Sequence, residues 1–145
     1  MIRIITIGKT KEKYLKQGID DFLTRLKPFH KVEYVELKDK KSIKQEGKDI
    51  LKKIKDEFVV VMDERGNECN SKVFSEFIKK KCLEESGKLV FIIGSATGLS
   101  DEVKEKANLR LALSQMTYTH EMARLFLLEQ IYRGFNIIKG TKYHK

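Results

Sequence analysis

Two runs of apolar residues constrain the fold of this chain more than any other feature of its sequence. Phe58–Asp63 reads FVVVMD and Leu89–Ile93 reads LVFII, with no polar side chain before Asp63. Strands that lack an alternation of polar and apolar residues are typical of parallel sheets that helices cover on both faces. We therefore expect both runs to be central strands of an α/β domain.

Strands and helices are predicted to alternate over the rest of the chain. The further strands that we expect are Ile2–Ile7, Val32–Leu37 as an edge strand, and Leu109–Leu113 as a third central strand. The expected helices are Lys11–Leu26, a polar helix from Ser42 to about Lys55, one capped by Ser71 that runs to about Glu85, Asp101–Ala107 capped by Ser100, and a last helix from about Glu121 to Ile138. This order predicts an α/β fold with a mostly parallel sheet flanked by helices, and 145 residues predict a single domain, 1–145.

Composition narrows the classes of function. No run of about 18 apolar residues is present, and the first residues lack the features of a signal peptide, so we expect a cytoplasmic protein without a membrane partner. Cys69 and Cys82 lie thirteen positions apart and the histidines are scattered, so we expect no metal. The net charge of +9 favours a polyanion such as nucleic acid, although the excess is spread over both halves and also promotes solubility.

Three loops follow strands that we expect to be central, and each contains small or polar residues. They are Met62–Gly66 (MDERG), Gly94–Gly98 (GSATG) and Ser114–Thr119 (SQMTYT). Ligands of open α/β sheets bind beyond the carboxyl ends of the strands, where these loops would meet. The chain has neither a G-x-G-x-x-G motif after its first strand nor a P-loop, so a ligand without phosphates is favoured.

The segment Leu113–Lys145 combines a polar loop, an apolar helix and a basic tail. The apolar side chains of the expected helix cover more of its surface than one narrow stripe along one face. They are Met122, Leu125, Phe126, Leu128, Ile131, Tyr132 and Phe135. A helix of this kind needs a partner. The chain beyond Glu129 has no acidic residue but has four basic ones, namely Arg133, Lys139, Lys142 and Lys145. Together these features predict an active site at a subunit interface, close to a polyanion.

The segments FIIGSATGLSDEV and LALSQMTYTHEMARLFLLEQIYRGFNIIKGTKYHK resemble a known enzyme family, as does MIRIITIGKTKEKYLKQGIDDFLTRL at the N-terminus. The most specific pieces are S-x-M-T followed closely by histidine, and the closing Tyr-His. The chain is similar to the RlmH family of large-subunit (23S) ribosomal RNA pseudouridine-N3 methyltransferases, which belongs to the SPOUT superfamily. The resemblance implies a SPOUT-type fold with a C-terminal trefoil knot, a homodimer, and methyl transfer from S-adenosylmethionine to the N3 atom of a pseudouridine, on the assembled ribosome.

The resemblance also implies which residues bind the cofactor. These are Met62, Gly94, Leu113, Ser114, Gln115, Met116, Thr117 and Tyr118. The family usually has two glycines where this chain has Gly94-Ser95, and serine fits there only if its backbone avoids the left-handed region. Ser95 is the one feature that favours the alternative function, a non-catalytic ribosome- or RNA-binding α/β protein with a vestigial cofactor pocket.

Methyl transfer to N3 requires removal of the N3 proton, and histidine is the natural base near neutral pH. The candidates are His144, which we slightly prefer, and His120. Arg124 and Arg133 are candidates for binding phosphate or stabilising the base, and Tyr143 for stacking on an unpaired base. In an antiparallel dimer, the tail of one subunit would complete the site of its partner.

Overall fold

Five parallel strands form one sheet in the computed structural model, which describes residues 1–145. Their order across the sheet is β2-β1-β4-β3-β5. The bounds are β1 Ile2–Ile7, β2 Val32–Leu37, β3 Phe58–Asn67, β4 Leu89–Ile93 and β5 Leu109–Leu111. Because all strands are parallel, their carboxyl ends lie at the same edge of the sheet.

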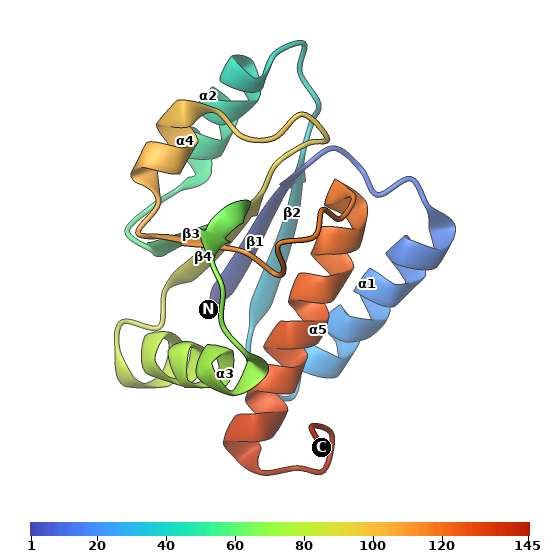
Figure 1. The fold of residues 1–145 in the computed structure, drawn as a ribbon, viewed down its shortest axis with the longest axis vertical. Coiled ribbons are helices and arrows are strands. Elements are labelled where there is room, and N and C mark those ends of the chain that lie inside the picture. The colour runs from blue at the N-terminus through green and yellow to red at the C-terminus, as the bar shows by residue number, and fades with distance from the viewer.

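Helices cover both faces of the sheet, as Figure 1 shows. Their bounds are α1 Lys13–Leu26, α2 Ile43–Lys53, α3 Ser71–Lys79 with a π-helical turn Lys80–Glu84 after it, α4 Asp101–Lys106 and α5 His120–Lys139. Helices α2 and α4 lie on one face, and α1, α5 and α3 lie on the other. The predicted α/β fold with a parallel sheet and flanking helices is confirmed.

The core consists of two apolar layers, one on each side of the sheet. Successive side chains of a strand point to opposite faces. In β1, Ile2 and Ile4 pack with α1, α3 and α5, whereas Ile5 and Ile7 pack with α2 and α4. All five residues of β4 are buried in the same alternating way. This double burial explains why the central strands read as continuous apolar runs.

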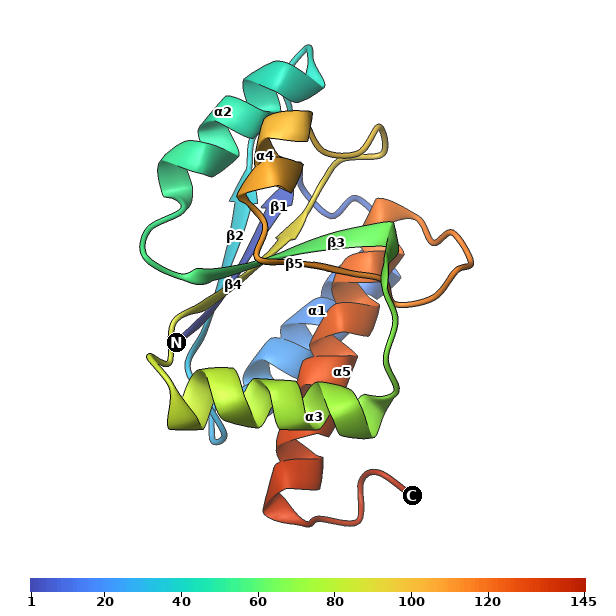
Figure 2. The same cartoon turned by 60° about the vertical axis from the view of Figure 1, so that its left-hand side comes forward.

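The prediction that Leu109–Leu113 is a central strand is wrong. β5 has three residues and lies at the edge of the sheet, paired only with β3 (Figure 2). Its middle residue, Arg110, is exposed, as an edge position allows. The third central strand is β1, whose six residues are all buried. The prediction that Ser71 caps α3 is also wrong, because the side chain of Asn70 accepts the hydrogen bond from the Val73 amide at 2.9 Å.

Most of the apolar side chains around α5 are covered by other helices of the same chain. The helix lies between α1 and α3, and its inner face is fully buried at Leu127, Leu128 and Ile131. The ring of Tyr132 packs against the rings of Phe22 in α1 and Phe29 just after it. Phe126 remains 39% exposed on the outer face. No helix of the structure combines the length and the apolar character needed to cross a membrane.

Candidate active site

A cleft of about 1090 Å³ opens at the carboxyl ends of the strands. Its walls come from the ends of β3, β4 and β5 and from the starts of α1 and α5. It is lined by nearly all of the predicted cofactor residues: Met62, Gly94, Leu113, Ser114, Met116, Thr117 and Tyr118. Two of the predicted loops, Gly94–Gly98 and Ser114–Thr119, therefore border one cavity. The prediction that Met62–Gly66 is a loop is wrong, because this segment is the end of β3, which runs to Asn67, although its residues do line the cavity. The size of the cavity is close to the range of roughly 300–1,000 Å³ typical of small-molecule sites.

The floor of the cleft is formed by a tight turn after β4. A Cβ atom on Gly94 would lie 2.6 Å from the carbonyl oxygen of Gly98, so only glycine fits there. Gly98 itself has a φ of +97°, in the left-handed region. Ser95 avoids that region, because no residue other than glycine has a positive φ. Its hydroxyl donates a hydrogen bond to Oε1 of the buried Glu46 at 3.2 Å, so serine is accommodated without strain.

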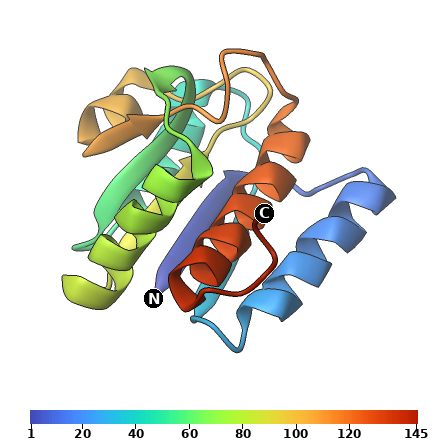
Figure 3. The same ribbon diagram turned by 60° about the horizontal axis from the view of Figure 1, so that its bottom comes forward.

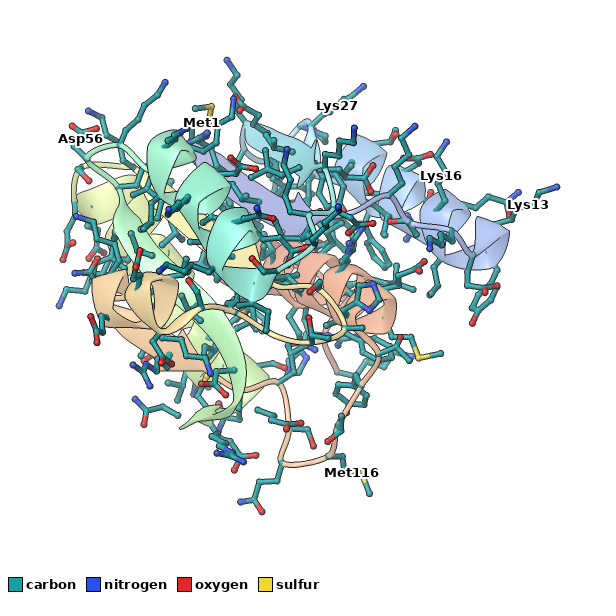
Figure 4. All side chains as sticks on the ribbon, turned by 90° about the horizontal axis from the view of Figure 1, so that it is seen from above. Met1, Lys13, Lys16, Lys27, Asp56 and Met116 are labelled. Carbon is teal, nitrogen blue, oxygen red and sulfur yellow. The ribbon has the colours of Figure 1, made fainter.

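The loop after β5 forms one wall of the cleft and is tied to β3 and the segment after it. The Thr117 hydroxyl donates to Oε2 of Glu64 at 2.6 Å, and the Gln115 amide donates to Oε2 of Glu68 at 3.2 Å. Gln115 does not line the cleft, because its side chain is directed to Glu68. Met116 lies at the tip of the loop and is 74% exposed (Figure 4).

The backbone of this loop has free hydrogen-bonding groups. The amides and carbonyls of Ser114, Gln115, Thr117 and Tyr118 form no hydrogen bond within the chain. Beside them stand the apolar side chains of Met62 and Leu113. Such a site fits the adenosyl group of the expected cofactor, because apolar side chains can enclose a flat ring while backbone groups bond to its edge.

His120 begins α5 at the mouth of the cleft. The preceding Thr119 caps the helix, since its hydroxyl accepts a hydrogen bond from the Met122 amide at 3.1 Å. Burial lowers the pKa of the His120 imidazole, and the nearby Arg124 guanidinium lowers it further. The neutral imidazole, which can accept a proton, is therefore favoured near neutral pH.

Arg124 is fully buried, with 0% of its surface exposed. Its guanidinium donates to the carbonyls of Ile7 and Gly8 at 2.6 and 2.9 Å, and also to the Thr10 hydroxyl and to Oε2 of Glu36 at 3.0 and 3.1 Å. These contacts hold the segment after β1. We therefore correct the predicted role: Arg124 has no surface left for a phosphate or a base, and we assign it to structure.

Glu121 is a second anchor of the segment after β1, and its role is not evident from the sequence. Its Oε1 atom accepts hydrogen bonds from the backbone amides of Lys11 and Glu12, at 2.8 and 3.1 Å. A carboxylate in the first turn of a helix is usually explained by the helix dipole alone. No local signal in the sequence therefore points to its contact with residues 110 positions away.

Tyr143 and His144 follow the C-terminal end of α5, whereas the cleft lies at its N-terminal end. Figure 3 shows the C-terminal tail turning back along the helix. The helix has 20 residues and is therefore about 30 Å long. After Gly140, the tail folds back over the helix, where the Tyr143 hydroxyl donates to Glu129 at 3.2 Å and His144 contacts Arg133 at 3.0 Å. Within one chain the structure thus separates these two predicted residues from the cofactor cleft.

The surroundings of Tyr143 favour its neutral phenol. Burial raises the pKa of Tyr143, and the Glu129 carboxylate raises it further. Glu129 also binds Arg133, whose guanidinium lies 4.9 Å from the centre of the Tyr143 ring. Tyr143 is consequently suited to stacking or to donating a hydrogen bond, and not to accepting a proton.

A smaller cavity of about 430 Å³ lies on the other side of the loop after β5, between α3 and α5. Its lining includes Leu113, Tyr118 and Phe126. The rings of Tyr118 and Phe126 meet edge to face at 4.9 Å and are both partly exposed. The outer face of α5 therefore borders an apolar hollow next to the cleft.

Comparison with known proteins adds independent information. Residues 1–144 match the family model described as "Predicted SPOUT methyltransferase". The chain is 44% identical to ribosomal RNA large subunit methyltransferase H of Carboxydothermus hydrogenoformans, with 99% of each chain covered. It is 43% identical to the protein of the same name from Caldicellulosiruptor bescii, with both chains covered completely.

Solved structures share the fold at low sequence identity. A "probable methyltransferase" from Bordetella pertussis aligns with a TM-score of 0.59 at 9% identity, covering 92% of this chain and 93% of the other. The tRNA (m1G37) methyltransferase of Aquifex aeolicus aligns with a TM-score of 0.56 at 14% identity, covering 91% and 69%. At such identities the likeness concerns the fold alone.

Proposed function

The chain belongs to the ribosomal RNA large subunit methyltransferase H family of SPOUT methyltransferases, and we infer from this that it transfers a methyl group from S-adenosylmethionine to large-subunit ribosomal RNA. The observation that carries this proposal is the match over the whole chain, from the first strand to the tail. The cleft at the ends of β3, β4 and β5 supports it, because its walls fit the cofactor. The acceptor that we propose is N3 of a pseudouridine, on the assembled ribosome in the cytoplasm.

The residues around the cleft have distinct parts in this reaction. The bound cofactor supplies an electrophilic methyl group. Met62 at the end of β3, Gly94 and the Leu113–Tyr118 segment would hold the cofactor, so that positioning would contribute much of the rate. In our mechanism His120 accepts the N3 proton, because it faces the cleft and its imidazole is favoured in the neutral form.

We further propose that the enzyme works as a homodimer whose sites are shared. Tyr143 and His144 reach no cleft in their own chain, so their assignment to the reaction requires the cleft of a partner subunit. Their roles would be stacking on the target base and, for His144, an alternative proton acceptor. The partly exposed Phe126 and Tyr118 beside the smaller cavity supply an apolar surface for that partner. The C-terminal trefoil knot stays a prediction.

Ser95 was the one feature that favoured a non-catalytic protein. Its backbone avoids the left-handed region and its hydroxyl forms a hydrogen bond with Glu46, so it no longer supports that alternative. The deciding experiment incubates the protein and labelled S-adenosylmethionine with ribosomes from a strain that lacks the gene. We expect one methyl group per large subunit, and a stop of reverse transcriptase at the modified pseudouridine. Calorimetry with the cofactor alone provides the control, and normal methylation in the deletion strain would refute the proposal.

The role of His120 can be tested through the pH dependence of methyl transfer. Its pKa is lowered, so the base-competent neutral form should already dominate below the usual histidine pKa of about 6.5. We expect kcat/KM to rise through that lowered pKa and then level off. His120→Gln should remove this acidic limb and reduce the rate roughly 10²- to 10⁴-fold. His30→Gln, outside the cleft, serves as the matched control, and an unchanged acidic limb in His120→Gln would assign the proton to another group.

A further inference from the structure

Four lysines follow one another closely at the rim of the cleft and pair with no carboxylate. They are Lys9, Lys11, Lys13 and Lys16, between the end of β1 and the second turn of α1, and all are exposed. Figure 4 shows Lys13 and Lys16 extending from α1 into solvent. Three more unpaired, exposed lysines, namely Lys38, Lys41 and Lys44, lie after β2, at the same edge of the sheet.

Four lysines at the opposite edge of the sheet are neutralised by carboxylates. Lys88 forms an ion pair with Asp56 at 2.7 Å, and Lys81 forms one with Glu85 at 2.9 Å. Lys79 and Lys80 also lie within 3.9 Å of carboxylates. Other lysines there are unpaired, such as Lys52, Lys53 and Lys55 at the end of α2, so the lysines before α1 are distinguished by their place beside the cofactor cleft and not by the absence of ion pairs alone.

Three carboxylates near the cleft bind the protein's own backbone and side chains and pair with none of these lysines. Glu36 accepts from the Thr10 amide and from Arg124, and Glu121 accepts from the amides of Lys11 and Glu12. Glu46 accepts from the amide of Lys40 and from Ser95. Glu12 and Asp39 are exposed beside the lysines but form no ion pair with them.

The same contacts fix the backbone that carries the lysines. Arg124 holds the carbonyls of Ile7 and Gly8, and Glu121 holds the amides at the start of α1. Both anchors belong to the first turns of α5, directly after the loop that lines the cleft. The lysine-bearing segment is therefore held at a fixed position relative to the cleft, although it is a surface loop.

Tyr14 stands among these lysines and is 60% exposed. It lines the rim of the cleft, next to Glu12 and Leu15. The ring of Tyr14 is therefore accessible at the entrance, where its apolar faces are available to a ligand. Exposed aromatic rings flanked by cations are the arrangement with which proteins bind unpaired nucleotides, by stacking and by phosphate contacts.

We propose that Lys9, Lys13, Lys16 and Tyr14 form the surface that docks the ribosomal RNA strand, with the lysines on its phosphates and Tyr14 stacked on a nucleotide beside the target. This inference rests on the proposed function and identifies how its substrate is bound. RNA is favoured over a membrane, because insertion into lipid requires an apolar helix face and Tyr14 is the only large apolar side chain exposed on α1.

The charge component is tested with two triple variants that each lower the net charge from +9 to +6. The first carries Lys9→Gln, Lys13→Gln and Lys16→Gln. The matched control carries Lys52→Gln, Lys53→Gln and Lys55→Gln, which are exposed and unpaired at the end of α2, away from the cleft. Binding of ribosomes is measured over a range of salt concentrations, together with S-adenosylmethionine binding by calorimetry.

We expect the first variant to bind ribosomes roughly 10- to 100-fold more weakly, with a salt dependence shallower by about two to three in log–log slope. The control should match the wild type, and both should retain cofactor affinity. Equal loss in the two variants would overturn the proposal in favour of general charge attraction. Wild-type protein that binds phosphatidylserine vesicles as tightly as ribosomes would overturn it in favour of a membrane.

The stacking component is tested with Tyr14→Ala and Tyr14→Phe. We expect Tyr14→Ala to raise KM for ribosomes roughly tenfold, in line with the loss of one stacked base, and Tyr14→Phe to restore the wild-type value. Cofactor affinity serves as the readout that a folding defect would change. If the wild type transfers methyl groups and Tyr14→Ala has an unaltered KM, the docking surface is refuted and the proposed function stands. If the wild type transfers no methyl group, the proposed function itself is refuted.

Discussion

Removal of Gly140–Lys145 is expected to abolish methyl transfer while the fold and cofactor binding persist. The tail packs on α5 through Glu129, Arg133, Asn136 and the ring of Tyr132, and none of its residues belongs to the buried core. The cleft lies at the other end of the same helix and keeps all of its residues. If Tyr143 and His144 position or deprotonate the base, their loss should reduce the rate roughly 10²- to 10⁴-fold. Single-turnover methylation of ribosomes and calorimetry with S-adenosylmethionine measure the two properties.

A mixture of two inactive chains shows in which subunit the tail acts. One chain is truncated after Lys139 and the other carries His120→Gln. In a dimer with shared sites, the intact cleft of the truncated chain meets the intact tail of its partner, so one of the two sites of each mixed dimer should regain activity. Lys142→Gln together with Lys145→Gln keeps Tyr143 and His144 and controls for the lost charge. Full activity of the truncated chain alone would remove the tail from the mechanism.

Arg124→Met is expected to lower the free energy of unfolding by about 3 kcal/mol or more, because it leaves two buried carbonyls and Glu36 without their donor. Urea denaturation followed by circular dichroism measures the change. Arg110→Met makes the same substitution at an exposed position of β5 and should be nearly neutral. An Arg124→Met protein with wild-type stability but no methyl transfer would contradict the structural role and restore the catalytic one.

The parts of the fold that depend on local patterns could be predicted from the sequence. Val59–Val61 and Leu89–Ile93 are buried on both faces in the structure, and the end of β3 and the loop after β4 line the cleft. The position of β5 could not be predicted in this way. Whether Leu109–Leu111 has one neighbour or two depends on strand order, which short apolar runs do not encode.

The roles of charged residues depend even more on long-range contacts. Arg124 resembles any arginine on a helix surface until the fold brings the end of β1 against it, 116 or 117 positions away. The sequence also places His144 close to the active-site segment along the chain. A straight helix of 20 residues then separates the two in space. Patterns in the sequence identified the residue types of the site, but only the packing shows which of them share a cleft.

The first two turns of α5 have a thermodynamic consequence. The loop that lines the cleft ends at Thr119, and the next turns contain Glu121 and Arg124, which fix the segment that carries the docking lysines. One short piece of helix is therefore common to the cofactor site and to the RNA-docking surface. If cofactor binding orders this piece of helix, the protein should bind RNA more tightly when the cofactor is present. Because linkage between two binding sites is reciprocal, RNA should then raise the affinity for the cofactor by the same factor.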